Sequence, residues 1–223
     1  MGSVVHVVDP ELADPASIAE AVAAIEAGGL VVLPTETVYG IACRPDDGAA
    51  TARLFAAKRR PARLSLPVLT SSVPEAFELG IPTPGAATLA EAFWPGPLTM
   101  VLARTERSAP WRLGTDPATI GLRVPDHPVA RSLLRATGPL AVTSANASGH
   151  PPAGSVDGLL DAFADAVAVY LVLAEPLPPD GHPPSTVVDL AHGRLGVVRQ
   201  GAIAPADLDR ILLGTGPQGD SVH

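Results

Sequence analysis

The chain of 223 residues contains a single lysine, Lys58, beside 14 arginines. This lysine stands in the run Lys58-Arg59-Arg60-Pro61. An ammonium is a compact point charge and a guanidinium is a planar fork, so the two are not interchangeable where a polyanion is bound. Pro61 disfavours a helical backbone at Arg60, which would let Lys58 and Arg60 turn toward one anion. The run therefore predicts an anion site. The alternatives are a surface lysine without a role and a basic helix end that faces its own dipole.

Short polar side chains directly follow or begin apolar runs in three other segments, at 34–40, 143–149 and 184–189. Hydroxyl and amide groups at strand ends of an α/β fold can bind phosphate or carboxylate oxygens. Each segment alone fits an ordinary turn or a helix cap equally well. The candidate binding side chains are Thr35, Tyr39, Thr143, Ser144, Asn146, Ser185 and Thr186.

Two further arginines, Arg123 and Arg199, end apolar runs where an unpaired guanidinium needs an anionic partner. For Arg199 the structural alternative is a pairing with Asp189. The chain has no Gly-x4-Gly-Lys-Ser/Thr loop, no Gly-x-Gly-x-x-Gly turn and no Gly-x-Ser-x-Gly elbow. If a nucleotide binds, hydroxyls and arginines scattered over the chain must hold its phosphates.

Composition limits the class of protein. A hydrophobic content of 47% with 17% charged residues favours a well-buried interior. The lone Cys43 allows no internal disulfide and favours a cytoplasmic location, and no apolar run approaches the roughly 18 residues of a membrane helix. The six histidines are scattered, so we expect no protein-built metal site. A net charge of −8 argues against wrapping nucleic acid as the main role.

Strand-like and helix-like patterns alternate along the chain, which predicts a single α/β domain over residues 1–213 with a flexible tail at 214–223. The fold class expected is a large, twisted, mostly mixed sheet flanked by helices around a concave cleft. Strands are predicted at 4–8, 30–33, 38–42, 67–70, 98–104, 119–123, 140–144, 167–173, 185–189 and 195–199. Helices are predicted at 17–27, 47–58, 85–92, 128–136, 156–163 and 205–213.

Seven motifs, in this order, resemble the YrdC/Sua5 family of threonylcarbamoyl-AMP synthases in its short, single-domain form. They are Leu-Pro-Thr-Glu-Thr-Val-Tyr-Gly at 33–40, Lys-x-Arg at 58–60, Trp-Pro-Gly-Pro-Leu-Thr at 94–99, Gly-Leu-Arg-Val-Pro at 121–125, Thr-Ser-Ala-Asn-x-Ser-Gly at 143–149, Pro-Ser-Thr-Val-Val-Asp at 184–189 and Val-Arg-x-Gly at 198–201. Any one motif is weak, but the seven together span about residues 15–205.

The resemblance implies an enzyme that joins L-threonine, bicarbonate or CO2, and ATP into threonylcarbamoyl-AMP and pyrophosphate. A separate tRNA threonylcarbamoyl transferase complex would then use the adenylate at tRNA position 37. Mg2+ would arrive with ATP, and direct tRNA contact would be weak. By the same resemblance, Thr35 and its loop, including Tyr39, would bind threonine. Lys58 and Arg60 would hold carboxylate, bicarbonate or phosphate oxygens, and Arg123 and Arg199 would face phosphate and carboxylate charges. The adenylate would contact Thr143, Ser144, Asn146, Ser185 and Thr186.

One position departs from the pattern, because Leu69 stands where many relatives carry a histidine. This leaves open a paralogue that makes a carbamoyl-adenylate from another amine. A non-catalytic RNA-binding module is a further alternative. A hydrogenase-maturation carbamoyltransferase needs additional zinc and acylphosphatase-like modules, for which this chain has no room.

Overall fold

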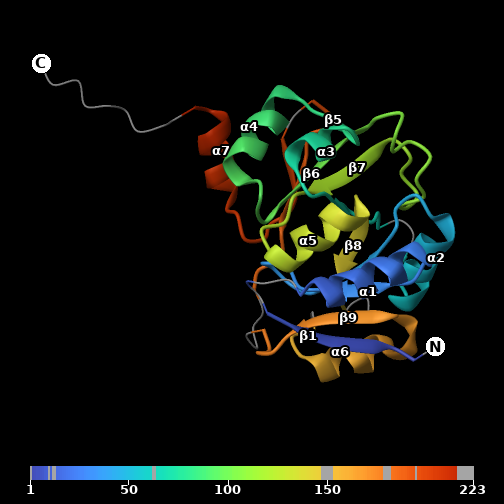
Figure 1. Ribbon diagram of the computed structural model, residues 1–223. Helices are drawn as coiled ribbons and strands as arrows, with labels where there is room; N and C mark the ends of the chain where they lie inside the picture. Colours follow the sequence, from blue (N-terminus) through green and yellow to red (C-terminus); the bar gives the residue numbers. More distant parts are fainter. Residues whose placement is uncertain are drawn as a thin grey trace, which may run out of the picture.

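Helices and strands alternate along the computed structural model, which describes residues 2–9, 11, 14–61, 64–146, 153–177, 182–193 and 195–214 (Figure 1). The strands are β1 (Val4–Val8), β2 (Val31–Leu33), β3 (Gly40–Cys43), β4 (Val68–Leu69), β5 (Gly80–Ile81), β6 (Leu98–Arg104), β7 (Thr119–Arg123), β8 (Leu140–Ser144), β9 (Val169–Leu173), β10 (Thr186–Asp189) and β11 (Gly196–Arg199). The helices are α1 (Pro15–Glu26), α2 (Gly48–Ala57), α3 (Val73–Phe77), α4 (Pro84–Phe93), α5 (Pro128–Thr137), α6 (Val156–Phe163), the 3-10 turn η1 (Ala164–Ala166) and α7 (Pro205–Leu212).

All the described strands belong to one mixed sheet in the order β1-β9-β2-β3-β8-β4-β7-β6-β10-β11, with β5 paired to β6. The sheet contains both parallel pairs, such as β1 with β9, and antiparallel pairs, such as β3 with β8. The expected α/β domain with a large mixed sheet is therefore confirmed.

The core lies on both faces of this sheet. Along β2 the side chains of Val31 and Leu33 join one apolar cluster with α1 and α5, while Val32 joins the other with α2 and α6. This alternation follows from the two-residue period of a strand. Because helices cover both faces, the central strands are apolar throughout, which explains why they read as continuous hydrophobic runs.

Helix ends follow local chemistry. The Asp47 side chain accepts hydrogen bonds from the N–H groups of Ala49 and Ala50 at the start of α2. At the end of α1, Gly28 takes the left-handed conformation with φ 77° that only glycine adopts without strain. The predicted boundaries of both helices agree with the structure to within two residues.

Three short elements were not predicted, α3, β5 and η1, because five, two and three residues are too few to show a periodic pattern. The described part of the chain contains no helix long and apolar enough to cross a membrane. Most of the predicted tail, from residue 215 onward, lies outside the described residues.

Candidate active site

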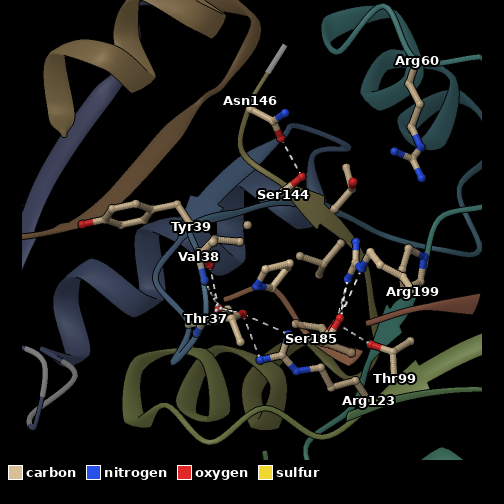
Figure 2. A pocket seen from close by; sticks show the side chains of 17 residues that line it. Thr37, Val38, Tyr39, Arg60, Thr99, Arg123, Ser144, Asn146, Ser185 and Arg199 are labelled. Atoms are coloured by element: carbon tan, nitrogen blue, oxygen red, sulfur yellow. Dashed lines mark hydrogen bonds between the residues drawn. The ribbon is translucent and has the colours of Figure 1, made fainter. Parts of the chain in front are cut away.

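A cavity of about 280 Å³ opens where seven neighbouring strands, from β3 to β11, bring their ends and loops together (Figure 2). Nine of the eleven predicted site residues line it. They are Thr35, Tyr39, Arg60, Arg123, Thr143, Ser144, Asn146, Ser185 and Arg199. The remaining lining residues are Thr37, Val38, Gly40, Pro67, Leu69, Thr99, Val142 and Pro184. Segments from residue 35 to residue 199 thus meet in one site.

The loop between β2 and β3 is held by its own hydroxyl groups. Thr35 Oγ1 donates to the Val38 carbonyl at 2.6 Å and accepts from the backbone N–H groups of Thr37 and Val38. It also lies 3.0 Å from Thr37 Oγ1. The Thr35 hydroxyl is therefore fully occupied within its loop, and the loop presents its shape to the cavity.

Tyr39 has a related role. Its hydroxyl accepts a hydrogen bond from the Leu173 N–H of β9 at 2.9 Å, and its carbonyl accepts from Ala145 N. The ring points away from the labelled arginines (Figure 2). Burial raises the pKa of this phenol, so it stays protonated. Tyr39 thus joins the loop to β9 and to the end of β8.

Arg123 ends β7 and is almost entirely buried, with 7% of its side chain exposed. Its Nη2 lies 2.7 Å from Glu36 Oε1. Both Nη1 and Nη2 donate to Thr37 Oγ1, and Nε donates to the Gly96 carbonyl. Arg123 lines the cavity as predicted, but much of its charge is met by a carboxylate that the sequence did not single out.

Lys58 is the C-cap of α2 and only 1% exposed. It lies behind the cavity wall: Nζ donates to the Ser144 carbonyl, to Ser144 Oγ and to Asn146 Oδ1. Arg59 takes a left-handed backbone with φ 48°, and this turns the chain toward the cavity at Arg60. Burial, with a smaller contribution from the Arg60 charge, lowers the pKa of Lys58 to about 7.

Arg60 and Arg199 line the cavity together with Arg123. Arg60 donates to the carbonyls of Leu64 and Ser65, and Arg199 donates to the Ser185 carbonyl and hydroxyl. Burial lowers the pKa of both guanidiniums, and the Arg199 charge adds to the effect on Arg60. Neither pairs with a carboxylate among the described residues. The alternative pairing of Arg199 with Asp189 is wrong, because Asp189 instead contacts His192 at the hairpin turn.

The neighbouring residues Ser185 and Thr186 have different surroundings. Ser185 Oγ faces the cavity and lies 2.9 Å from Thr99 Oγ1. Thr186 is fully buried outside the lining, where its hydroxyl donates to the Ile203 carbonyl and accepts from the N–H groups of Gly201 and Ile203. Side chains alternate along a strand, so adjacent hydroxyls cannot both reach one cavity.

An apolar wall completes the cavity. It is formed by Pro67 just before β4, Leu69 of β4 and Val142 of β8. Leu69 is 4% exposed and belongs to the apolar cluster beneath α5. At residue 69, where many relatives carry a histidine, the cavity is therefore closed by an apolar side chain and not by a hydrogen-bonding group.

Glu36, Thr37 and Thr99 were not named as site residues. Thr37 and Glu36 stand beside Thr35 in the same motif, and Thr99 ends the Trp-Pro-Gly-Pro-Leu-Thr motif, so the motifs contained the signal. The ion pair of Glu36 with Arg123 and the hydrogen bonds of Thr37 with Arg123 and of Thr99 with Ser185 depend on tertiary structure. In the described part of the chain no group of three His, Cys, Asp or Glu side chains could hold a metal ion.

Comparisons with known proteins all indicate the same family. The Sua5/YciO/YrdC family model, described as telomere recombination, matches residues 23–201. A Mycobacterium tuberculosis (strain H37Rv) protein provisionally named threonylcarbamoyl-AMP synthase is 42% identical over 87% of this chain and 88% of its own length. The threonylcarbamoyl-AMP synthase of Chromohalobacter salexigens is 41% identical over 68% of this chain and 83% of its own. The crystal structure of P. abyssi Sua5 complexed with L-threonine superposes with a TM-score of 0.78 at 30% identity, covering 94% of this chain and 59% of that one.

Proposed function

Because the chain belongs to the Sua5/YciO/YrdC family, we propose that it is a threonylcarbamoyl-AMP synthase. This nucleotidyltransferase converts L-threonine, bicarbonate or CO2, and ATP into threonylcarbamoyl-AMP and pyrophosphate. The observation that carries the proposal is the pair of guanidiniums, Arg60 and Arg199, that face a polar cavity without a carboxylate partner among the described residues.

The chemistry needs two bond-forming steps. The threonine amine attacks the carbon of CO2 and loses a proton, which gives a carbamate; with bicarbonate the same attack expels hydroxide, which leaves as water with the amine proton. A carbamate oxygen then attacks the α-phosphorus of ATP, and pyrophosphate leaves with the electron pair of the broken P–O bond. Neither step needs a covalent enzyme intermediate. Both need the substrates held in line and the anionic oxygens stabilised by fixed donors.

The side chains at hand can meet these needs. A guanidinium has five N–H donors, and the bonds of Arg60 and Arg199 within the described structure use only Nε and Nη2. Their remaining donors can hold phosphate or carboxylate oxygens. Lys58, Thr143, Ser144 and Asn146 on one side, and Ser185 on the other, would support the adenylate.

For the amine substrate, the Thr35 loop and the Tyr39 backbone shape the pocket, with Arg123 behind them. Thr186 would act by holding Ser185 in place. The apolar wall at Leu69 favours a side chain with a methyl group. A paralogue acting on another amine is the second candidate, and replacement of threonine by valine or serine in the assay distinguishes it.

Mg2+ would be held mainly by the triphosphate of ATP, since its hard oxygen ligands are the phosphates themselves. Removal of Mg2+ with a chelator should stop turnover, and Mg2+ should restore it. We place the product upstream of a tRNA threonylcarbamoyl transferase complex that acts at position 37, with at most weak direct tRNA contact. An enzyme that supplies the substrate for tRNA modification would also fit a cytoplasmic location.

The test is pyrophosphate release with ATP and Mg2+, with L-threonine or bicarbonate omitted in turn and the nucleotide product identified by mass. Release that needs both, with the mass of threonylcarbamoyl-AMP, is the expected result. ATP binding without turnover with any amino acid would contradict the proposal. Tight, salt-sensitive RNA binding without turnover would favour the RNA-binding alternative, against which the net charge of −8 speaks.

A further inference from the structure

Glu36 is the carboxylate that pairs with Arg123 of the cavity lining, and no described lining residue is itself acidic. Both of its oxygens are buried, and Oε1 lies 2.7 Å from Arg123 Nη2. Neither oxygen accepts an aligned hydrogen bond from a described residue. Glu36 therefore acts on Arg123 through charge at close range more than through directed hydrogen bonding.

Arg123 in turn fixes the direction of a chain of hydroxyl groups. A guanidinium only donates, so Thr37 Oγ1 accepts from both Nη1 and Nη2. Its own proton must then point to Thr35 Oγ1, whose proton goes to the Val38 carbonyl. The donors of Arg123 are thus largely used inside the protein, although the residue lines the cavity and its charge still reaches Arg199.

Three guanidiniums line the cavity, Arg60, Arg123 and Arg199, with Lys58 behind them, and without Glu36 none of the three would have a carboxylate partner among the described residues. The proposed reaction releases pyrophosphate, a polyanion that such a site would hold tightly. A single carboxylate at short distance offsets one of the positive charges, and its effect in a partly buried site is large.

We propose that Glu36 is a positioning residue that offsets the charge of Arg123, so that Arg123 organises the Thr35–Val38 loop without adding a third free cation to the polyanion site. This inference rests on the proposed function for the identity of the polyanion. Glu36 touches neither substrate nor product in this role. Its effect on the site passes through Arg123.

The test is direct binding of pyrophosphate, measured by titration calorimetry without turnover, to four proteins: wild type, Glu36→Gln, Arg123→Met and the double variant. Glu36→Gln keeps the shape and removes the charge, so pyrophosphate should bind on the order of tenfold more tightly. Arg123→Met leaves Glu36 uncompensated and should weaken binding by a similar factor. The double variant should return close to wild type.

A role in packing alone predicts a different pattern, in which both single variants weaken pyrophosphate binding and the double variant weakens it further. That result, or unchanged affinity in Glu36→Gln, would overturn the inference. Glu78→Gln is the matched control, because Glu78 pairs with Arg107 on the surface and lies outside the cavity lining. Thermal unfolding shows whether each variant is folded, and the double variant keeps the test open should Arg123→Met alone unfold. Because binding is measured without catalysis, an inactive but pyrophosphate-binding protein would refute the proposed function separately.

Discussion

Lys58 differs from the other cations of the site in that it can lose its charge near neutral pH. Its pKa is lowered to about 7 by burial, with repulsion from Arg60 as the smaller cause, while its contacts are the neutral oxygens of Ser144 and Asn146. In the empty site at pH 8 the amine is mostly neutral. A bound polyanion favours the ammonium and raises this pKa, so binding must take up a proton.

We therefore expect ATP binding at pH 8 to be coupled to the uptake of about one proton. At pH 6, below the pKa of Lys58, this contribution should vanish because the amine is already charged. Calorimetry in two buffers with different ionisation enthalpies measures the uptake. Lys58→Arg, which stays charged at both pH values, is the control and should show none; equal uptake in this variant would contradict the assignment.

Turnover gives a second test of the same residue. Lys58→Ala removes the donor to Ser144 and Asn146 and should reduce kcat by at least about 100-fold, with the fold retained. Lys58→Arg should not restore activity, since a planar fork cannot take the place of a compact ammonium between these acceptors. Pyrophosphate release and circular dichroism check both statements. Near-normal activity of Lys58→Ala would show that the lone lysine has no catalytic importance.

At the level of single residues, the sequence predicted which side chains lie at the cavity better than it predicted their hydrogen-bond partners. Of the eleven residues predicted from residue types, spacing and motifs, nine line the cavity. They did not reveal that the Thr35 hydroxyl is used within its own loop, that Thr186 is turned away, or that Lys58 is buried behind Ser144. Which partner a hydroxyl or amine finds depends on segments far apart in the chain, and short-range patterns do not contain that information.

Among the elements, the β10–β11 hairpin positions the side of the cavity that Ser185 and Arg199 line, and it does so through a glycine. A Cβ at Gly201 would lie 2.1 Å from the Pro184 carbonyl oxygen and 2.6 Å from the Ser185 carbonyl carbon. These are backbone atoms, which cannot yield as a flexible side chain can. The segment after β11 can therefore pack against Pro184 and Ser185 only because residue 201 has no side chain.

Gly201→Ala should displace Ser185 and raise the KM for ATP several-fold, and overpacking should cost about 1–3 kcal/mol of stability. Steady-state kinetics and thermal unfolding measure the two effects. Gly196→Ala in the same hairpin is the matched control, because its Cβ would meet only the Asp189 Cβ at an ordinary 3.8 Å. Similar changes in both variants would mean that close approach at Gly201 is unimportant.

Element prediction succeeded where patterns were long and failed where they were short. β6 and α5, with seven and ten residues, were predicted to within one residue, whereas α3 and β5 were missed. The pairing order was beyond sequence reasoning. β9 lies between β1 and β2 and pairs in parallel with both, although it follows them by more than a hundred residues in the chain, and local patterns do not contain that pairing.

For the whole molecule, one sheet carries both apolar clusters, so the domain should unfold as a unit. Among the residues that the structure describes, none that lines the cavity lies beyond Arg199. We expect removal of residues 215–223 to leave kcat, KM and the midpoint of thermal unfolding unchanged, with a single transition before and after. A fall in midpoint or a second transition would show that the end of the chain contributes to the domain.

The pairing of β1 with β9 joins Val4 to Val169, and the cavity joins the loop at Thr35 to Arg199. Contacts of such high sequence separation form slowly, because long loops must close before any stabilising contact is made. During synthesis on the ribosome, β1 cannot pair with β9 until most of the chain has been made. The ability to bind ATP should therefore arise late and abruptly, when the final hairpin has emerged, and nascent chains that stop before it should hold no nucleotide.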